Sequence, residues 1–262
     1  MKKHLSVLMI ASRTIWRVLA IILITAAVQT ALFAAVPQEM SETTQYWYDG
    51  WQTQTVTWNP TLTETFEEAH TGLVAAVGFV LMCFILCVKT SGYGTAVRYT
   101  VSRLRVREEA LNLWWALYFT ACAVLFWMSQ ILVMQLLCRF FMWRADPADV
   151  NGQTVSIAWY VNTYLHNLMP GRDMGRWVRN ILLAPMVGTA LAAFSMVQRR
   201  RQGISFLAIG AVALTVVSFC LKLDNGFAYA VSVLVLFLLG VALVKLLTVY
   251  RADETEEGGT AA

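Results

Sequence analysis

The chain has 262 residues, of which 58% are hydrophobic and only 14% are charged, and its formal net charge is +4. This composition leaves too little polar surface to cover a water-soluble globule, so soluble domains are excluded and lipid is the expected solvent. The apolar residues are gathered into long blocks, which predicts one membrane domain with no nucleic-acid partner.

We predict an all-α fold of six transmembrane helices, because a helix needs about 20 apolar residues to cross a hydrocarbon core about 30 Å thick. Pro185 predicts a kink in the fourth helix. A secretory signal peptide is the alternative for the first, but its apolar run exceeds the usual length of about 7 to 15 residues. The predicted spans cover residues 18–36, 71–88, 110–138, 180–198, 203–221 and 226–244.

The positive charges lie mainly on one side of these spans. Fourteen of the 20 Lys and Arg residues fall in the two termini and in the second and fourth connections. Because Lys and Arg concentrate in cytoplasmic loops, both termini are predicted to be cytoplasmic. Residues 1–17 then form a basic cytoplasmic N-terminus, residues 18–249 the membrane domain, and residues 250–262 an acidic, disordered tail.

The two long outer loops, residues 37–70 and 139–179, are rich in aromatic residues. The first has six acidic residues and no Lys or Arg, which agrees with an outer location. Its Tyr and Trp side chains fit either a belt lying on the headgroups or a cap that grips a cationic ligand. Within the second loop, residues 155–169 are typical of an interfacial helix that ends at Pro170.

No residue pattern predicts catalysis, a cofactor or a metal, so we expect this chain not to be an enzyme. Ionisable residues at the centre of a span usually mark ion coupling or intramembrane chemistry, and the predicted spans have none there. Glu67, Glu68 and His70 lack the second histidine of a zinc-binding helix, and no phosphate-binding loop motif occurs. The five cysteines form no C-x-x-C pair and are interpreted as buried thiols.

The connection between the second and third spans, residues 89–109, combines apolar and basic positions at helical spacing. Val97, Val101 and Leu104 recur on one face, while arginines and Ser102 recur on another. A short amphipathic helix is therefore predicted, which would lie on the membrane surface and offer its basic face to a cytosolic protein or to anionic headgroups. A simple topogenic loop is the alternative.

The string from Ala96 to Arg107, AVRYTVSRLRVR, is followed by an aromatic third span that begins at Leu113-Trp114-Trp115. Together they resemble the same connection in membrane subunits of bacterial type-2 ABC exporters. In that family a short basic helix with a core like Arg98 to Arg103 couples the permease to its ATPase. The long outer loops after spans one and three depart from the family, whose longer outer segment usually lies between spans five and six.

The resemblance implies a permease subunit in the bacterial cytoplasmic membrane, which pairs with a second membrane subunit and with a separate ATP-binding subunit. A non-transporting accessory or sensor subunit with a ligand-recognising outer loop is the alternative. The resemblance also assigns roles within the connection. Arg98, Ser102, Arg103 and Arg105 would face the ATPase, and Tyr99, Val101 and Leu104 would seat the helix on the membrane domain.

Overall fold

A computed structural model describes residues 12–47, 51–90, 108–147, 150–199, 206–222 and 225–259. The chain is mostly helical, and five of its described helices are long and apolar enough to cross a membrane. The protein is therefore a multi-pass membrane protein, as its composition predicted. These five helices are α2 (Ile15–Ala35), α4 (Thr71–Thr90), α6 (Glu108–Arg144), α9 (Met174–Arg199) and α11 (Asn225–Gly259).

The fifth predicted span, residues 203–221, corresponds to a shorter helix. This helix, α10 (Phe206–Cys220), has 15 residues in the described part of the chain. At 1.5 Å per residue it is about 22 Å long, less than the hydrocarbon core of about 30 Å. Residues 203–205 lie outside the described residues, so a count of six spans stays a prediction.

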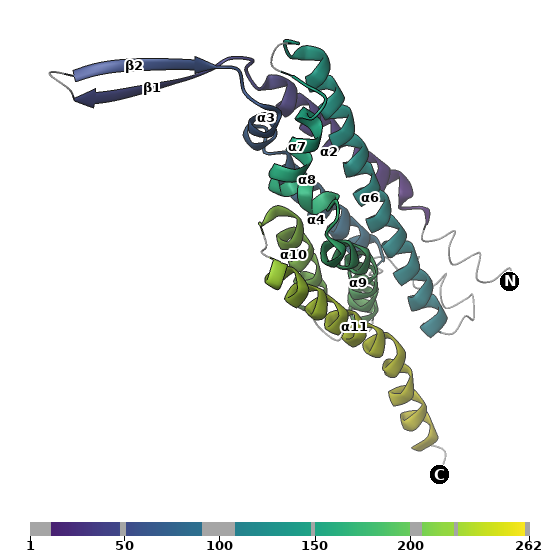
Figure 1. Ribbon diagram of the computed structural model, residues 1–262. Helices are drawn as coiled ribbons and strands as arrows, with labels where there is room; N and C mark the ends of the chain where they lie inside the picture. The colour runs from purple at the N-terminus through teal and green to yellow at the C-terminus, as the bar shows by residue number, and fades with distance from the viewer. Residues whose placement is uncertain are drawn as a thin grey trace.

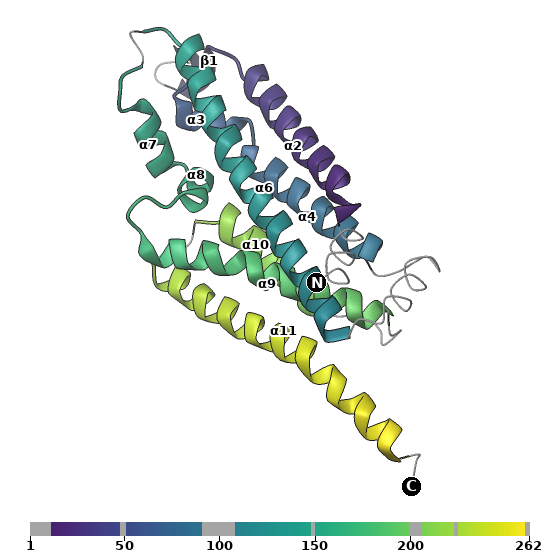
Figure 2. The same cartoon turned by 90° about the vertical axis from the view of Figure 1, so that its right-hand side faces the viewer.

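The helices run between two ends of an elongated bundle (Figures 1 and 2). At one end, here called the terminal end, α2 and α6 begin while α4, α9 and α11 end. The opposite end, here called the hairpin end, holds a β-hairpin and three short helices. These short helices are α3 (Leu62–Glu68), α7 (Thr154–Val161) and α8 (Thr163–Leu168).

A β-hairpin, which the sequence analysis did not predict, adds two strands to the mostly helical fold. Its strands, β1 (Met40–Trp47) and β2 (Trp51–Trp58), pair antiparallel within the predicted outer loop and project away from the bundle (Figure 1). Thr, Trp and Tyr favour strands, and Asp49-Gly50 between them is a sequence typical of hairpins. The hydroxyls of Thr43 and Thr55, which face each other across the ladder, lie 3.1 Å apart.

Several helices extend beyond their predicted bounds. The third span becomes the 37-residue α6, and the fourth begins six residues early, at Met174. The last helix, α11, continues to Gly259, into the acidic tail of residues 250–262; the disorder of this tail stays a prediction. Glu, which occurs three times in residues 250–259, is a strong helix former in water and can prolong a membrane helix beyond the bilayer.

The predicted interfacial helix at residues 155–169 is present as two pieces, α7 and α8. They are separated by Asn162, whose side-chain oxygen accepts a hydrogen bond of 3.1 Å from the backbone N–H of Leu165. This contact caps α8 and turns the chain back towards the bundle.

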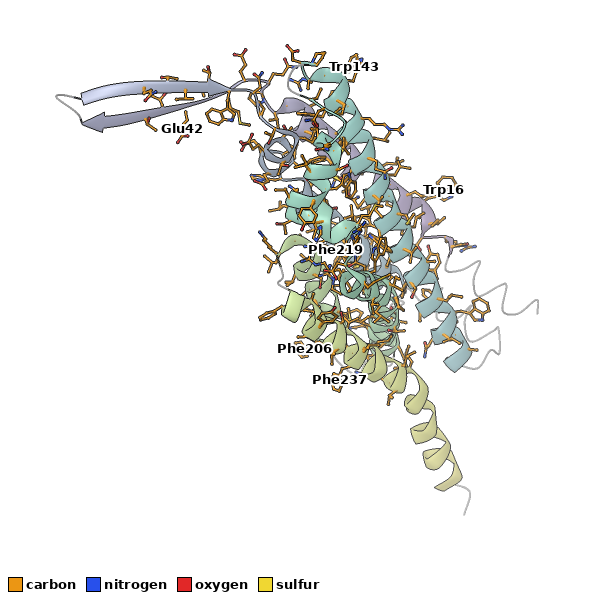
Figure 3. All side chains as sticks on the ribbon, viewed as in Figure 1. Trp16, Glu42, Trp143, Phe206, Phe219 and Phe237 are labelled. Atoms are coloured by element: carbon orange, nitrogen blue, oxygen red, sulfur yellow. The ribbon has the colours of Figure 1, made fainter. Side chains whose placement is uncertain are left out.

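The outer surface of the bundle is apolar and the interior is closely packed. Trp16, near the terminal end, and Trp143, at the hairpin end, are 77% and 83% exposed (Figure 3). Tryptophans at both ends of an apolar band are typical of the two membrane interfaces. Phe206 and Phe237 also point outwards, as expected of side chains in contact with lipid.

The α9 helix is the most buried of the five long helices, because 72% of the residues in its apolar stretch are buried inside the structure. It packs against α4, α6, α10 and α11. At its crossing with α6, Gly188 faces Ala116 and Thr120 so closely that a Cβ atom would lie 2.7 Å from the backbone nitrogen of Thr120. A glycine is required here because the two backbones approach each other.

Candidate functional site

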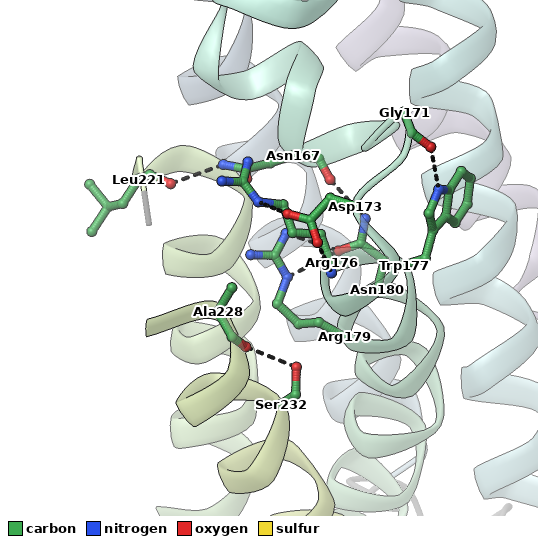
Figure 4. Close-up of polar contacts among 10 residues, drawn as sticks. All are labelled: Asn167, Gly171, Asp173, Arg176, Trp177, Arg179, Asn180, Leu221, Ala228 and Ser232. Atoms are coloured by element: carbon green, nitrogen blue, oxygen red, sulfur yellow. Dashed lines mark hydrogen bonds and ion pairs between the residues drawn. The ribbon is translucent and has the colours of Figure 1, made fainter. Parts of the chain in front are cut away.

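A polar cluster is buried where α9 begins, beside α8 and the end of α10 (Figure 4). Asp173 caps the helix by accepting a hydrogen bond from the backbone N–H of Arg176 at 3.3 Å. Its second carboxylate oxygen lies 3.0 Å from Nε of Arg176. The carboxylate therefore satisfies the start of the helix and neutralises one of the two arginines on its first turns.

The second arginine, Arg179, is fully buried and makes contact with an amide instead of a carboxylate. Its Nε and Nη2 atoms donate to Oδ1 of Asn180 at 3.2 and 3.1 Å. Its Nη1 atom is buried and has no hydrogen-bond partner. A buried guanidinium is costly unless it is paired, so an arginine held in this way within a membrane helix marks a candidate functional position.

The two asparagines of the cluster join three helices. Asn180 donates to the backbone carbonyl of Asn167 on α8 at 2.7 Å. Asn167 in turn donates to the carbonyls of Phe219 and Leu221 at 3.2 and 2.9 Å, at the end of α10. Because the last carbonyls of a helix lack partners within it, Asn167 satisfies groups that would otherwise be left unpaired. The cluster thus fixes the hairpin ends of α8, α9 and α10 to one another.

A second buried polar group joins α2, α4, α6 and α8. Gln29 donates from Nε2 to the carbonyl of Thr71 at 3.0 Å and to Oε1 of Gln130 at 2.9 Å. The hydroxyl of Tyr164 donates to the same Oε1 atom at 3.2 Å. The Nε2 atom of Gln130 and the Oε1 atom of Gln29 are buried without partners.

Between these two polar groups lies an apolar cavity of about 60 Å³. Gln130, Tyr164 and Asn180 stand at its hairpin end, while Phe79 and Val187 line it nearer the centre of the bundle. A site that is mostly apolar, with a few convergent polar groups, is the usual character of a small-ligand pocket. The cavity and the polar groups beside it form the candidate functional site.

The predicted docking residues fall outside the part of the chain that the structure describes. Arg98, Ser102, Arg103 and Arg105, together with the predicted seating residues Tyr99, Val101 and Leu104, lie outside the described residues. The helices that flank them are described: α4 ends at Thr90 and α6 begins at Glu108, both at the terminal end. The roles of these seven residues stay predictions.

Arg179 is the residue that the sequence analysis missed. The fourth span was predicted to begin at Asn180, which left Arg179 in an outer loop. A signal was present, because Asp173, Arg176 and Asn180 follow one another at helical spacings of three and four residues. That spacing is typical of a helix that starts earlier and carries an ion pair in its first turn.

No known family model matches the chain, and the comparisons with curated proteins and with solved structures likewise found no match. Within the described ranges, no group of three or more His, Cys, Asp or Glu residues is placed to hold a metal ion. Membership of the exporter family therefore stays a prediction from the sequence of residues 96–107.

Proposed function

We propose that the chain is the permease subunit of an ABC exporter, with six spans and both termini in the cytoplasm of a bacterial cell. A separate ATP-binding subunit would supply the energy, and a second membrane subunit, identical or related, would complete the transport path. The substrate would cross the cytoplasmic membrane as whole helices change their tilt.

The basic connection between α4 and α6 is the single observation that carries this proposal. The family-like string, residues 96–107, contains four arginines, and Lys89 is a fifth basic residue in the same connection. The helices on either side of the string, α4 and α6, meet it at the end where α2 begins and α11 ends. A cytosolic ATPase could reach all of these segments from one side of the membrane.

The interior of the long helices also supports a particular mechanism of transport. It fits transport driven by the movement of whole helices better than transport driven by the protonation of buried acids. None of the buried residues of the described part is an acid or a lysine, and Arg179 is the buried residue that carries a full charge. Carriers driven by protons usually need buried carboxylates or histidines along their path. An external source of energy fits this interior better.

Affinity purification in mild detergent tests the proposal. We expect an ATPase to co-purify in a fixed ratio, and we expect its loss when Arg98, Arg103 and Arg105 are changed together to Glu. The matched control changes Arg199, Arg200 and Arg201 to Glu, which alters the charge equally at the end of α9 and in the connection that follows it. Retention of the ATPase by the first variant, or a wild-type chain that purifies without any ATPase, would contradict the proposal.

The projecting β-hairpin favours an accessory or sensor subunit as the second candidate. The described side chains of β1 and β2 are largely exposed, and the hairpin stands away from the bundle as a recognition element would. Deletion of residues 41–57 separates the two functions. A sensor subunit would lose its response while keeping its partners, whereas a permease would retain the transport of its substrate.

A further inference from the structure

The apolar cavity continues into a groove on the surface of the bundle. The groove has a volume of about 430 Å³ and shares Gly72, Ala76 and Tyr164 with the cavity, together with Val216 and Cys220. Leu73, which also lines the groove, is 65% exposed on the apolar face of α4. The groove therefore opens towards lipid, so that a molecule dissolved in the bilayer can reach the cavity without crossing water.

The cavity is long and narrow. Its lining on α4 runs from Gly72 to Phe79, which corresponds to about 10 Å along the helix axis. A volume of about 60 Å³ is room for roughly four water-sized groups, so only a single file of atoms fits along this length. Its walls beyond the polar end are aromatic and aliphatic, and apolar cavities of this kind stay dry and take apolar guests.

One hydrogen-bond donor is left unused at the polar end. Nε2 of Gln29 must be a donor because it faces the carbonyl of Thr71, and the atom of Gln130 that faces it must then be the acceptor. The amide nitrogen of Gln130 is left without a partner, although the residue is only 2% exposed and lines the cavity. A buried donor of this kind favours a guest that brings an acceptor.

The geometry points to a fatty acyl chain as the occupant of this cavity. The carbonyl oxygen of the chain accepts a hydrogen bond from Gln130, and its alkyl part extends past Phe79 and Val187 towards the centre of the bundle. The rest of the molecule lies in the groove, where the exposed side chains of Glu67 and His70 stand beside Thr163. This inference is independent of the exporter proposal, because binding of the chain requires no ATPase.

Photolabelling of the full-length protein in phosphatidylcholine vesicles tests the inference. Two probes carry the same diazirine in the alkyl chain: a free fatty acid and a phosphatidylethanolamine. We expect one or both to label the α9 peptide that contains Ala184 and Val187, and we expect excess oleate to suppress the labelling. Labelling by the phosphatidylethanolamine identifies a membrane lipid as the source of the chain, and labelling by the fatty acid alone identifies a free acid.

Variants at the entrance and at the donor make the test specific. Ala76→Phe narrows the junction of groove and cavity and should lower labelling of α9 about tenfold. Val77→Phe, one residue away on the exposed face of α4, is the matched control and should leave labelling unchanged. Gln130→Leu should weaken binding about fivefold, while Gln135→Leu on the exposed face of α6 should not.

Two results would overturn the inference. One is labelling of α9 that excess oleate does not suppress and that Ala76→Phe leaves unchanged, since this would mean contact with bulk lipid only. The other is the absence of α9 labelling with both probes. If Ala76→Phe does not fold, Val216→Phe narrows the same junction from α10 and replaces it in the comparison.

Discussion

Gly188→Ala should destabilise the protein although alanine is the better helix former. The added Cβ atom would lie 2.7 Å from the backbone nitrogen of Thr120 and 2.8 Å from the carbonyl oxygen of Ala116, and it would also overlap Oγ1 of Thr120. Backbone atoms cannot turn aside as a flexible side chain can, so α6 and α9 must separate. Overpacking of this kind costs about 1–3 kcal/mol.

Helix propensity acts in the opposite direction and sets the size of the expected effect. Replacing glycine by alanine in a helix gains about 1 kcal/mol. Since the contacts of Gly188 are with backbone, the cost should lie in the upper part of its range, which leaves a net loss of about 1–2 kcal/mol. Gly240→Ala on α11 is the matched control, because a Cβ atom there would meet nothing within 4 Å.

Thermal unfolding in detergent, followed with a thiol-reactive fluorophore, measures this difference. Cys122 is buried on α6, next to the crossing, and becomes reactive when the two helices separate. At about 2–4 °C per kcal/mol, the midpoint of Gly188→Ala should fall by about 2–8 °C. A midpoint equal to or above that of Gly240→Ala would show that α6 and α9 do not approach each other closely at Gly188.

Three further outcomes are expected. Asn180→Leu should destabilise the protein by about 3 kcal/mol, because it leaves Arg179 buried without an acceptor. Arg179→Met, which removes the buried charge, should be close to neutral in thermal unfolding. Equal losses of stability in the two variants would contradict this. Thr61→Ala should cost about 1 kcal/mol, since it breaks the capping box with Glu64, and Thr63→Ala is its control. Burial, followed by the charge of Arg176, lowers the pKa of His166 below its usual value, so its contribution to stability should be lost as the pH falls below about 6.5. The midpoint of His166→Gln should then depend less on pH between about 7 and 5.5, and an unchanged slope would refute this.

The spans could be predicted because lipid imposes a simple requirement on sequence. Long uncharged runs such as residues 18–36 and 226–244 correspond to helices α2 and α11, since a chain in hydrocarbon must satisfy its own backbone. The start of α9 was missed because charged residues interrupt the hydropathy pattern there. Arg176 and Arg179 resemble loop residues in a hydropathy pattern, but Asp173 pairs with Arg176 and Asn180 accepts two hydrogen bonds from Arg179 inside the protein.

The polar parts of the candidate site could not be predicted from the sequence. Asn167 and Asn180 come together only because α8 turns back onto the start of α9, and Gln29 and Gln130 are a hundred residues apart in the chain. The hairpin was missed although its composition favours strands. Its alternating residues lack an apolar face, and such a face is the usual signal of a strand packed on a core.

The helix α9 connects the polar cluster, the apolar cavity and the crossing with α6. Asn180, Leu183, Ala184 and Val187 follow the spacing of one helical face, and all four line the cavity. Gly188, one residue further on, is the point at which α9 crosses α6.

Any tilt of α9 about this crossing therefore moves the cavity wall and the polar cluster together. Arg179 lies nine residues from Gly188, or about 14 Å, so a rotation of about 5° displaces its backbone by about 1 Å. A displacement of that size would break the 2.7 Å hydrogen bond between Asn180 and the carbonyl of Asn167. The polar cluster thus holds α9 in one orientation, and a change in the shape of the cavity by tilting of α9 requires its release.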